Sequence, residues 1–193
     1  RALSSSQFAA IGTKAISGFT AEQVDAFTTG QIKAINASSI KGFTTTALAA
    51  FDTTQVAAFS TTALSGLTNK GIVAFDASMI RVLDTAQVQA LSSAAVKGLS
   101  AAQMAALDDD IQYFDAEDVR ALVSAQMAGL TTTQLQSMTT AQWSQVSPKA
   151  ILGLDAADFR VLDTAELAAI GTATFKALTA AQVAGIEIGD IDD

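Results

Sequence analysis

Two apolar positions recur every eight residues along almost the whole chain. Residues 4–186 divide into 23 consecutive units of eight residues, here called octads, with one residue missing within 108–114. When each octad is numbered from 1 to 8, positions 5 and 8 are apolar in all 23 copies. In the octad 52–59, DTTQVAAF, these positions are Val56 and Phe59. The pattern indicates one small structural unit that is repeated many times.

The polar positions of the octad have the pattern of a helix start. Position 1 is Ser, Thr, Asp or Asn in 20 copies, and position 4 is Gln in ten. A hydroxyl or carboxylate residue followed three residues later by Gln is a capping box, and apolar residues on either side of it form a hydrophobic staple. The only proline, Pro148, falls at position 2, where a first helical residue needs no N–H donor. Each octad therefore predicts a new helix.

Longer helices and strands do not fit this period. In one straight helix an eight-residue step turns the apolar face by about 80°, so that no single face would be buried. In a strand, positions 5 and 8 would point to opposite faces. The sequence predicts an all-α solenoid, a superhelix of very short capped helices with one helix of about six residues per octad.

Small residues at position 7 predict how the coils of this solenoid meet. Position 7 is Ala or Gly in 18 of 23 copies, and several of its glycines are 24 residues apart. This spacing predicts roughly three octads per coil, with glycine where successive coils touch. We expect one octapeptide-repeat domain over residues 1–193. The glycines concerned are Gly18, Gly42, Gly66, Gly98, Gly129, Gly153 and Gly185.

The array also carries a longer internal repeat and incomplete octads at its ends. Residues 76–107 are matched by residues 155–186 at an offset of 79, as a duplication of ten octads with the one-residue gap would give. Residues 1–3 fit positions 6–8 of an octad, and residues 187–193 fit positions 1–7. We expect the chain to be a fragment of a longer array or a processed chain.

Composition excludes several classes of chemistry. The chain has no cysteine and no histidine, which removes thiol chemistry, disulfides and the commonest general base. No apolar run approaches the roughly 20 residues that a membrane-spanning helix needs. The net charge is −8, with seven basic and five acidic residues in 1–107 but four basic and fourteen acidic residues in 108–193. Such a surface does not favour nucleic acid, because phosphate binding needs clustered Lys and Arg.

The densest group of acidic residues coincides with the irregular octad. The segment 108–118, DDDIQYFDAED, carries six carboxylates, which are the oxygen ligands that calcium prefers. A calcium site is one interpretation. In the other interpretation, Asp108 and Asp115, the first residues of two successive octads, are N-caps. The remaining acidic residues are then solvated in a first helical turn. The candidate ligands are Asp108, Asp109, Asp110, Asp115, Glu117 and Asp118.

No catalytic or cofactor-binding residue is predicted. A nucleophile paired with histidine is excluded by composition, and no glycine-rich phosphate loop occurs. The acid pairs Asp155 with Asp158 and Asp163 with Glu166 occupy positions 1 and 4, so we interpret them as helix caps. Among the methionines, Met79 alone stands at position 4 and is expected to be less buried. We therefore expect no enzymatic activity and, calcium apart, no cofactor.

The octad resembles a known type of bacterial repeat. The stretches 130–138, LTTTQLQSM, and 178–186, LTAAQVAGI, resemble the degenerate L-T-x-x-Q-[VI]-x-x-L arrays of very large exported bacterial proteins, often adhesin-like or haem-utilisation-like. The likeness covers almost the whole chain. It implies an extracellular or cell-surface location, a spacer or adhesive role and no enzymatic activity. A haem function is put in doubt here, because no histidine is present to ligate iron.

Three functions remain open at this point. The first is a non-enzymatic structural repeat module, either a spacer or an adhesion segment, of a bacterial surface or secreted protein. The second is a binding scaffold for a protein, a glycan or calcium through the acidic half, residues 108–193. The third is a module that self-assembles end to end into filaments, because a solenoid with uncapped ends exposes apolar surface.

Overall fold

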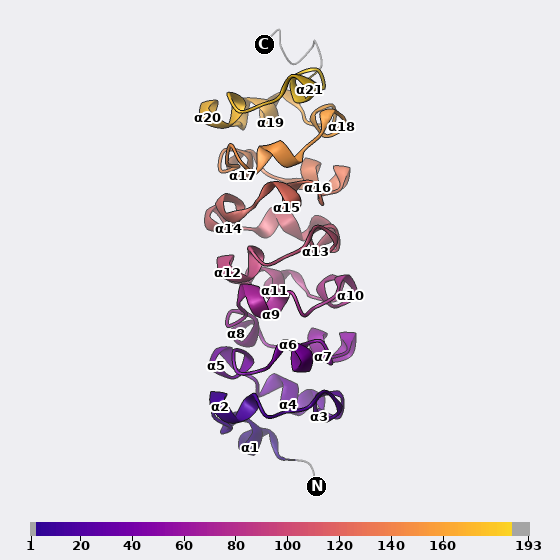
Figure 1. Cartoon of the computed structure of the whole chain (residues 1–193), viewed down its shortest axis with the longest axis vertical. Helices are drawn as coiled ribbons and strands as arrows, with labels where there is room; N and C mark the ends of the chain where they lie inside the picture. The colour runs from indigo at the N-terminus through magenta and orange to yellow at the C-terminus, as the bar shows by residue number, and fades with distance from the viewer. Residues whose placement is uncertain (1–2, 187–193) are drawn as a thin grey trace. The chain divides into compact units, whose positions relative to one another are not determined.

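The chain folds as an all-α solenoid of short helices. The structure is a computed structural model that describes residues 3–186. Within these residues it contains 21 α-helices and two 3₁₀ helices, without any strand, so that each octad has its own helical segment (Figure 1). The predicted fold class is confirmed.

Two compact units make up the chain, Arg1–Leu99 and Ser100–Asp193. The interpretation of residues 1–193 as one domain stays a prediction. The helices of the first unit are α1 Ser5–Ala9, α2 Thr13–Ile16, α3 Ala21–Asp25, α4 Thr29–Lys33, α5 Ala37–Ile40, α6 Thr45–Leu48, α7 Thr53–Ala57, α8 Thr61–Leu64, α9 Asn69–Ile72, α10 Ala77–Arg81, α11 Thr85–Gln89 and α12 Ser93–Val96.

The second unit continues the same pattern, with a 3₁₀ helix in place of an α-helix in two octads. Its segments are α13 Ala101–Ala105, η1 Asp108–Tyr113, α14 Ala116–Ala121, α15 Ser124–Met127, α16 Thr132–Ser137, α17 Thr140–Trp143, η2 Ile151–Gly153, α18 Ala156–Phe159, α19 Thr164–Ala169, α20 Thr172–Phe175 and α21 Ala180–Val183.

Capping boxes start the helices as the octad predicts. At α7 the Asp52 carboxylate accepts a hydrogen bond from the Gln55 backbone N–H at 2.7 Å, and the Gln55 side-chain oxygen accepts one from the Asp52 N–H at 3.0 Å. Both bonds satisfy donors that a helix start otherwise leaves without a partner. Where glycine stands at position 1, as at Gly12 and Gly171, no side-chain cap forms.

Each helix ends within the same octad because the chain turns at positions 8 and 1. At the end of α7 the Phe59 N–H bonds the Val56 carbonyl at 3.1 Å. The next residue, Ser60, is extended at φ −74° and ψ 154° and caps α8. Extended residues at most junctions between the short helices change the direction of the chain from one octad to the next.

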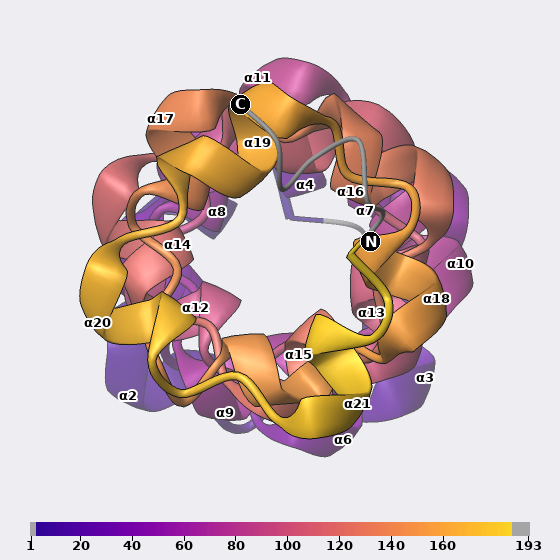
Figure 2. The same cartoon turned by 90° about the horizontal axis from the view of Figure 1, so that it is seen from above.

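Helices that pack together lie three octads apart, as the glycine spacing predicts. In the first unit α2 packs on α5 and α5 on α8, and these helices follow one another along one edge of Figure 1. In the second unit α14 packs on α17 and α18 on α21. In Figure 2 the helices of the first unit form a ring, and so do the helices of the second unit. Within each unit the octads therefore form successive coils.

Positions 5 and 8 form the core. Val56 is fully buried and Phe59 is 3% exposed, and Trp143 is also fully buried. In the first unit the position 8 phenylalanines add direct ring contacts, such as the 5.0 Å between the centroids of Phe51 and Phe59. Such aromatic pairs stabilise a core beyond the burial of their area. Towards the end of the described residues, position 5 is exposed at Phe175 by 40%.

The glycines at position 7 allow close contact between coils. A Cβ atom added at Gly66 would lie 2.2 Å from the Ala37 carbonyl oxygen, and one added at Gly153 would lie 1.9 Å from the Ser124 carbonyl oxygen. In both cases the contacted residue belongs to the octad three positions earlier. At Gly18 the only neighbour is the Ala15 carbonyl oxygen of the same turn, at 3.2 Å. Glycine is therefore required at Gly66 and Gly153, where the backbone of an earlier coil lies against position 7.

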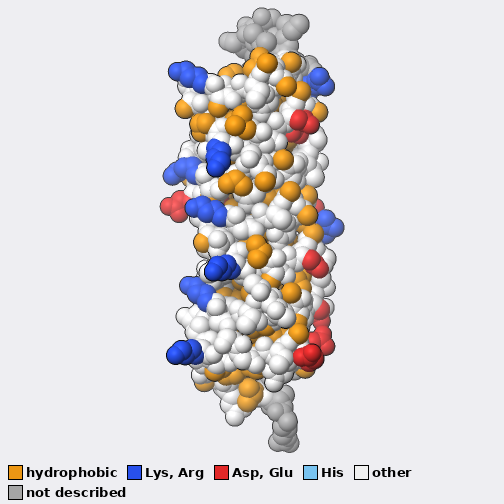
Figure 3. All heavy atoms as spheres, in the orientation of Figure 1, with side chains coloured by type: hydrophobic (Ala, Val, Ile, Leu, Met, Phe, Trp, Pro, Cys, Tyr) orange, Lys and Arg blue, Asp and Glu red, His pale blue; other side chains and the backbone are white. Residues whose placement is uncertain are grey.

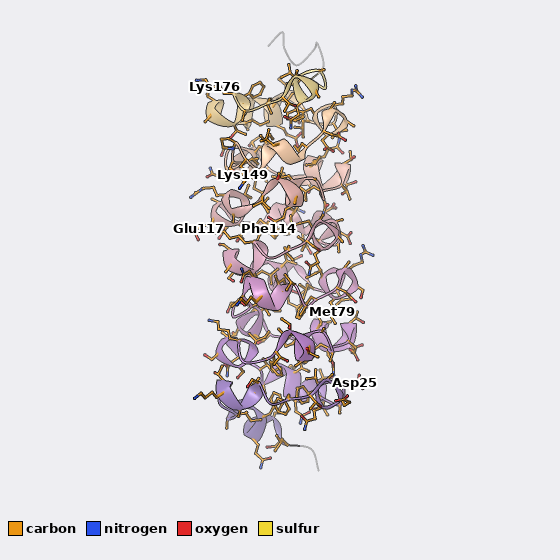
Figure 4. The ribbon with its side chains drawn as sticks, viewed as in Figure 1. Asp25, Met79, Phe114, Glu117, Lys149 and Lys176 are labelled. Carbon is orange, nitrogen blue, oxygen red and sulfur yellow. The ribbon has the colours of Figure 1, made fainter. Side chains whose placement is uncertain are left out.

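Met79 is the least buried methionine, as expected, but the difference is small. Its side chain, labelled in Figure 4, is 6% exposed, against 0 to 3% for Met104, Met127 and Met138. Position 4 faces neighbouring octads, so a side chain at this position is buried even though it is polar in most copies. Every buried polar side chain among residues 3–186 stands at position 4: Gln31, Ser39, Gln55, Gln87, Gln103, Asp118, Gln126, Gln134, Gln142, Glu166, Thr174 and Gln182.

The interpretation of Asp108 as an N-cap is wrong. The residue before η1 is Leu107, which is helical at φ −72° and ψ −7° and forms no side-chain cap. Asp108 instead has φ 46°, the only positive φ of a non-glycine residue in the described part of the chain. With one residue fewer, the octad has no room for a separate extended cap, and Asp tolerates the left-handed region better than most residues.

Candidate functional site

The glutamine at position 4 joins two coils. In the first unit, the side-chain oxygen of Gln55 caps its own helix, while its Nε2 donates hydrogen bonds to the carbonyl oxygens of Val24, Asp25 and Phe27 at 3.0 to 3.1 Å. These three carbonyls are at the end of α3, four octads earlier. A helix end leaves its last carbonyls without helical partners, so one amide side chain satisfies a helix start and a helix end together.

The same arrangement occurs in the second unit. Nε2 of Gln142 donates to the carbonyls of Ile111 and Phe114, both at 2.9 Å. Nε2 of Gln182 donates to those of Ile151 and Leu154, at 2.8 and 2.9 Å. The helices pack three octads apart but these hydrogen bonds reach four octads back, so one coil contains between three and four octads.

Sequence reasoning identified only half of this role. The capping box explains the side-chain oxygen of the position 4 glutamine, but it does not explain why the residue is Gln so often and Glu only at Glu166. Both residues accept a hydrogen bond from the cap, whereas only Gln also donates one. The preference for Gln at position 4 therefore indicates a second contact, in which the side-chain amide donates a hydrogen bond.

The pKa values of Glu166 and Asp158, two acidic residues at position 4, are raised. Burial raises the pKa of Glu166 above its ordinary value, the hydrogen bond from the Asp163 N–H lowers it, and the Asp163 charge raises it further. The indole N–H of Trp143 also opposes the rise, although Nε1 forms no hydrogen bond of good geometry within the described residues. Burial raises the pKa of Asp158 in the same way. A carboxylate here accepts the cap bond but cannot donate to a carbonyl.

The two acid pairs are helix caps, as the sequence predicts. Asp155 accepts from the Asp158 N–H at 3.0 Å and Asp158 accepts from the Asp155 N–H at 2.8 Å. Asp163 and Glu166 bond each other in the same reciprocal way, at 2.7 and 2.9 Å. These carboxylates hold helix starts, and their geometry assigns them no acid–base chemistry.

The acidic segment 108–118 does not converge on one point. Asp108, Asp109 and Asp110 lie in the first turn of η1. Asp115 caps α14 by accepting from the Glu117 and Asp118 N–H groups at 2.8 and 2.9 Å. Within residues 3–186 no group of three or more acidic side chains is placed to hold a metal ion. Titration with calcium tests the calcium interpretation of this segment.

Charged side chains lie on the surface. The lysines and arginines of position 6 are all exposed, and Figure 3 shows basic side chains on both units. Asp25 lies on the outside of the first unit and Lys176 on the outside of the second (Figure 4). None of the helices described has the length and hydropathy to cross a bilayer. The position 6 residues are Lys33, Lys41, Arg81, Lys97, Arg120, Arg160 and Lys176.

Comparison with protein families gives one match. The family model for the ALTTAQ repeat matches residues 1–37, 80–110, 111–147 and 151–187, which is most of the chain. Residues 38–79 lie outside these matches, but they form the same capped octads, from α5 to α10. No curated protein matches the sequence.

Proposed function

The chain belongs to the ALTTAQ repeat family, and from this premise we propose that it is a non-enzymatic structural module of a bacterial surface or secreted protein. In this role it acts as a spacer or as an adhesion segment. The observation that carries the proposal is the use of its polar side chains. Most position 1 residues cap helices, and the buried glutamines of position 4 join octads, so both sets serve the scaffold.

The form of the solenoid supports this role. Each coil lies on the previous one through glycine contacts and amide hydrogen bonds that repeat along each unit. Stability in such arrays comes from contacts between neighbouring repeats, so that length is set by the number of repeats. A spacer needs this property, and an adhesion segment uses the exposed positions of the same scaffold.

Location and role need separate tests. Antibodies against this segment should label intact cells that produce the parent protein, and external protease should remove the label. Replacement of the segment by an unrelated helical repeat of equal length should then preserve adhesion if the segment is a spacer and abolish it if the segment is the adhesive part. Label that appears only after cell lysis would contradict both roles.

A binding scaffold is the second candidate, and the charge of the second unit favours it. Fourteen of the nineteen acidic residues lie in 108–193, and Asp109, Glu117 and Asp155 among them are exposed. Full-length protein with these three residues changed to Asn or Gln should lose binding to a basic protein or glycan. A matched variant that neutralises Glu22, Asp25 and Asp52 in the first unit serves as the control.

Self-association is the third candidate. The exposure of Phe175 and Val183, 40% and 48%, supports an apolar contact between copies. Sedimentation of the full chain over a wide concentration range tests it, because association raises the mean mass with concentration. A Phe175→Ser variant should remain monomeric where the unchanged chain associates. A constant monomer mass for the unchanged chain would remove this candidate.

A further inference from the structure

A row of lysines crosses successive coils of the first unit. Its members are 27, 29 and 27 residues apart and stand alternately at positions 3 and 6 of their octads. The glutamine hydrogen bonds between coils span similar distances along the chain, 28 to 31 residues, so these lysines recur about once per coil. All four side chains are exposed. The lysine row consists of Lys14, Lys41, Lys70 and Lys97.

Backbone contact between coils brings the first two members of the row together. Gly42, which follows Lys41, lies directly against the backbone of Thr13. Lys14 is the residue after Thr13 and belongs to α2, and α2 packs on α5, which ends at Lys41. The two lysines therefore start from neighbouring points on adjacent coils.

The other steps of the row have the same basis. Gly98, which follows Lys97, lies against the backbone of Asn69, the residue before Lys70. The helices concerned, α9 and α12, pack on each other. Between the two pairs, Lys41 and Lys70 line one surface hollow, and among the described residues no Asp or Glu lines it. The row is thus continuous from α2 to α12.

Most acidic residues of the first unit lie away from the lysine row. Four of the five belong to α3 or cap α7 and α10: Glu22, Asp25, Asp52 and Asp76. Figure 1 shows these three helices along the edge opposite α2 and α5. In Figure 3 several basic side chains of this unit follow one edge, and acidic side chains gather near the other. An anion along the row would therefore meet positive charge with few competing carboxylates.

From this arrangement we infer that the lysine row is an interaction surface for a linear acidic polysaccharide, which lies across successive coils with one carboxylate near each ammonium group. Packed helices are about 8–10 Å apart, so the positive charges recur at about this distance. A nucleic acid strand carries a phosphate about every 3.4 Å, so most of its phosphates would fall between lysines. A polysaccharide with one carboxylate in each pair of sugars has a sparser charge and fits better. The surface does not depend on the proposed structural role.

The number of contacts determines the affinity of such a surface. A single exposed ion pair changes an affinity by no more than about fivefold. Four pairs on one scaffold act together, because once the first carboxylate is bound the next is held near its lysine at a high effective concentration. Binding should therefore increase with the length of the polymer and decrease with salt.

The test uses the full chain and hyaluronan, a linear polymer with one carboxylate per disaccharide. Fluorescence anisotropy of labelled fragments of increasing length, at low salt, measures binding. We expect the affinity to rise with length until the fragment covers the row. Binding should disappear with the methyl-esterified polymer, and also at about 1 M salt, where the Debye length is about 3 Å.

Three outcomes would overturn the inference. Affinity that does not change with fragment length would exclude a row of contacts. Equal or tighter binding of an oligothymidylate of the same length would assign the surface to phosphate and not to a polysaccharide. The absence of binding by every probe at low salt would exclude the surface altogether.

Charge-matched variants locate the surface. Single Lys→Gln changes within the row should each weaken hyaluronan binding about two- to fivefold, and the fourfold variant about a hundredfold. The fourfold variant carries Lys14→Gln, Lys41→Gln, Lys70→Gln and Lys97→Gln.

The matched control removes the same charge from exposed residues outside the row. It carries Lys33→Gln, Arg81→Gln, Arg160→Gln and Lys176→Gln. We expect this variant to retain most of the affinity. Circular dichroism checks that both fourfold variants are folded, and the single variants measure the same effect with the smallest change. Equal losses in the two fourfold variants would show that net charge alone matters and would overturn the lysine row.

Discussion

The side-chain amide of Gln87 donates a hydrogen bond to the carbonyl oxygen of Phe59, 2.8 Å away and four octads earlier. The same amide donates to the Ala57 carbonyl at 3.1 Å, and its oxygen accepts from the Asp84 N–H at 2.8 Å. One buried side chain therefore closes the end of α7 and the start of α11. Contacts of this kind convert a series of short helices, each unstable alone, into a stack.

Exchange of this glutamine for glutamate tests the donor contact. Gln87→Glu keeps the cap acceptor but places a carboxylate against two carbonyls, so we expect a loss of about 2–4 kcal/mol in the free energy of unfolding at pH 7. Urea unfolding of the full chain, followed by circular dichroism, measures it. The control is Gln7→Glu, since Gln7 is exposed and only caps α1. Equal losses in the two variants would show that capping alone matters.

The reverse exchange at Glu166 should stabilise the protein. Glu166→Gln supplies a donor that, by register, meets the carbonyls of Leu135 and Met138, and we expect a gain of about 1 kcal/mol at pH 7. Thermal melting of the full chain measures the gain.

The gain from Glu166→Gln should depend on pH. Because the folded pKa of Glu166 is raised, its contribution to stability is fully present below the unfolded pKa and is lost as the pH rises through the folded pKa. The advantage of Gln should therefore be greatest at neutral pH and should decrease as the pH falls below the unfolded pKa of about 4.3, where the carboxyl becomes protonated in both states. A gain that does not change with pH would contradict this explanation.

Adding one methyl group at position 7 should destabilise the contact between coils. In Gly66→Ala the new Cβ would lie 2.2 Å from the Ala37 carbonyl oxygen, which belongs to the backbone and cannot rotate away. We expect a loss of about 1–3 kcal/mol, measured by the urea midpoint. Gly18→Ala is the matched control, because its only neighbour is at 3.2 Å, and it should be neutral or stabilising. A similar loss in both variants would assign the effect to backbone freedom and not to contact.

Calcium should leave the chain unchanged. Asp115 and Asp118 are engaged in a capping box, and no three acidic groups converge in the part of the chain that is described. We expect no heat on titration with calcium and the same melting temperature with and without a chelator. Saturable heat near one ion per chain, lost in Asp109→Asn with Asp110→Asn, would instead establish the calcium site at 108–118.

The local repeat made most of the fold predictable. The caps, the buried positions 5 and 8 and the three-octad contact at Gly66 all follow from side chains within one octad or from their spacing. The burial of Met79 and the donor bonds of Gln87 did not follow, because they depend on which octad lies four places earlier. The eight-residue pattern alone does not show which octad lies against which.

The candidate sites were less predictable for the same reason. The acids of 108–118 are close in sequence, but whether they converge depends on where each lies in η1 and α14. Sites that form through contacts between coils can be identified only from the structure.

The left-handed turn at Asp108 shows how the repeat array accommodates the loss of one residue. Ile111 and Phe114 remain buried despite the missing residue, and the full eight-residue pattern resumes with the cap at Asp115. A lost codon is thus absorbed within a single helical segment, and the segments on either side keep their structure. Arrays of this kind are free to diverge by small deletions as well as by point substitutions, wherever an aspartate, asparagine or glycine is available to make the turn.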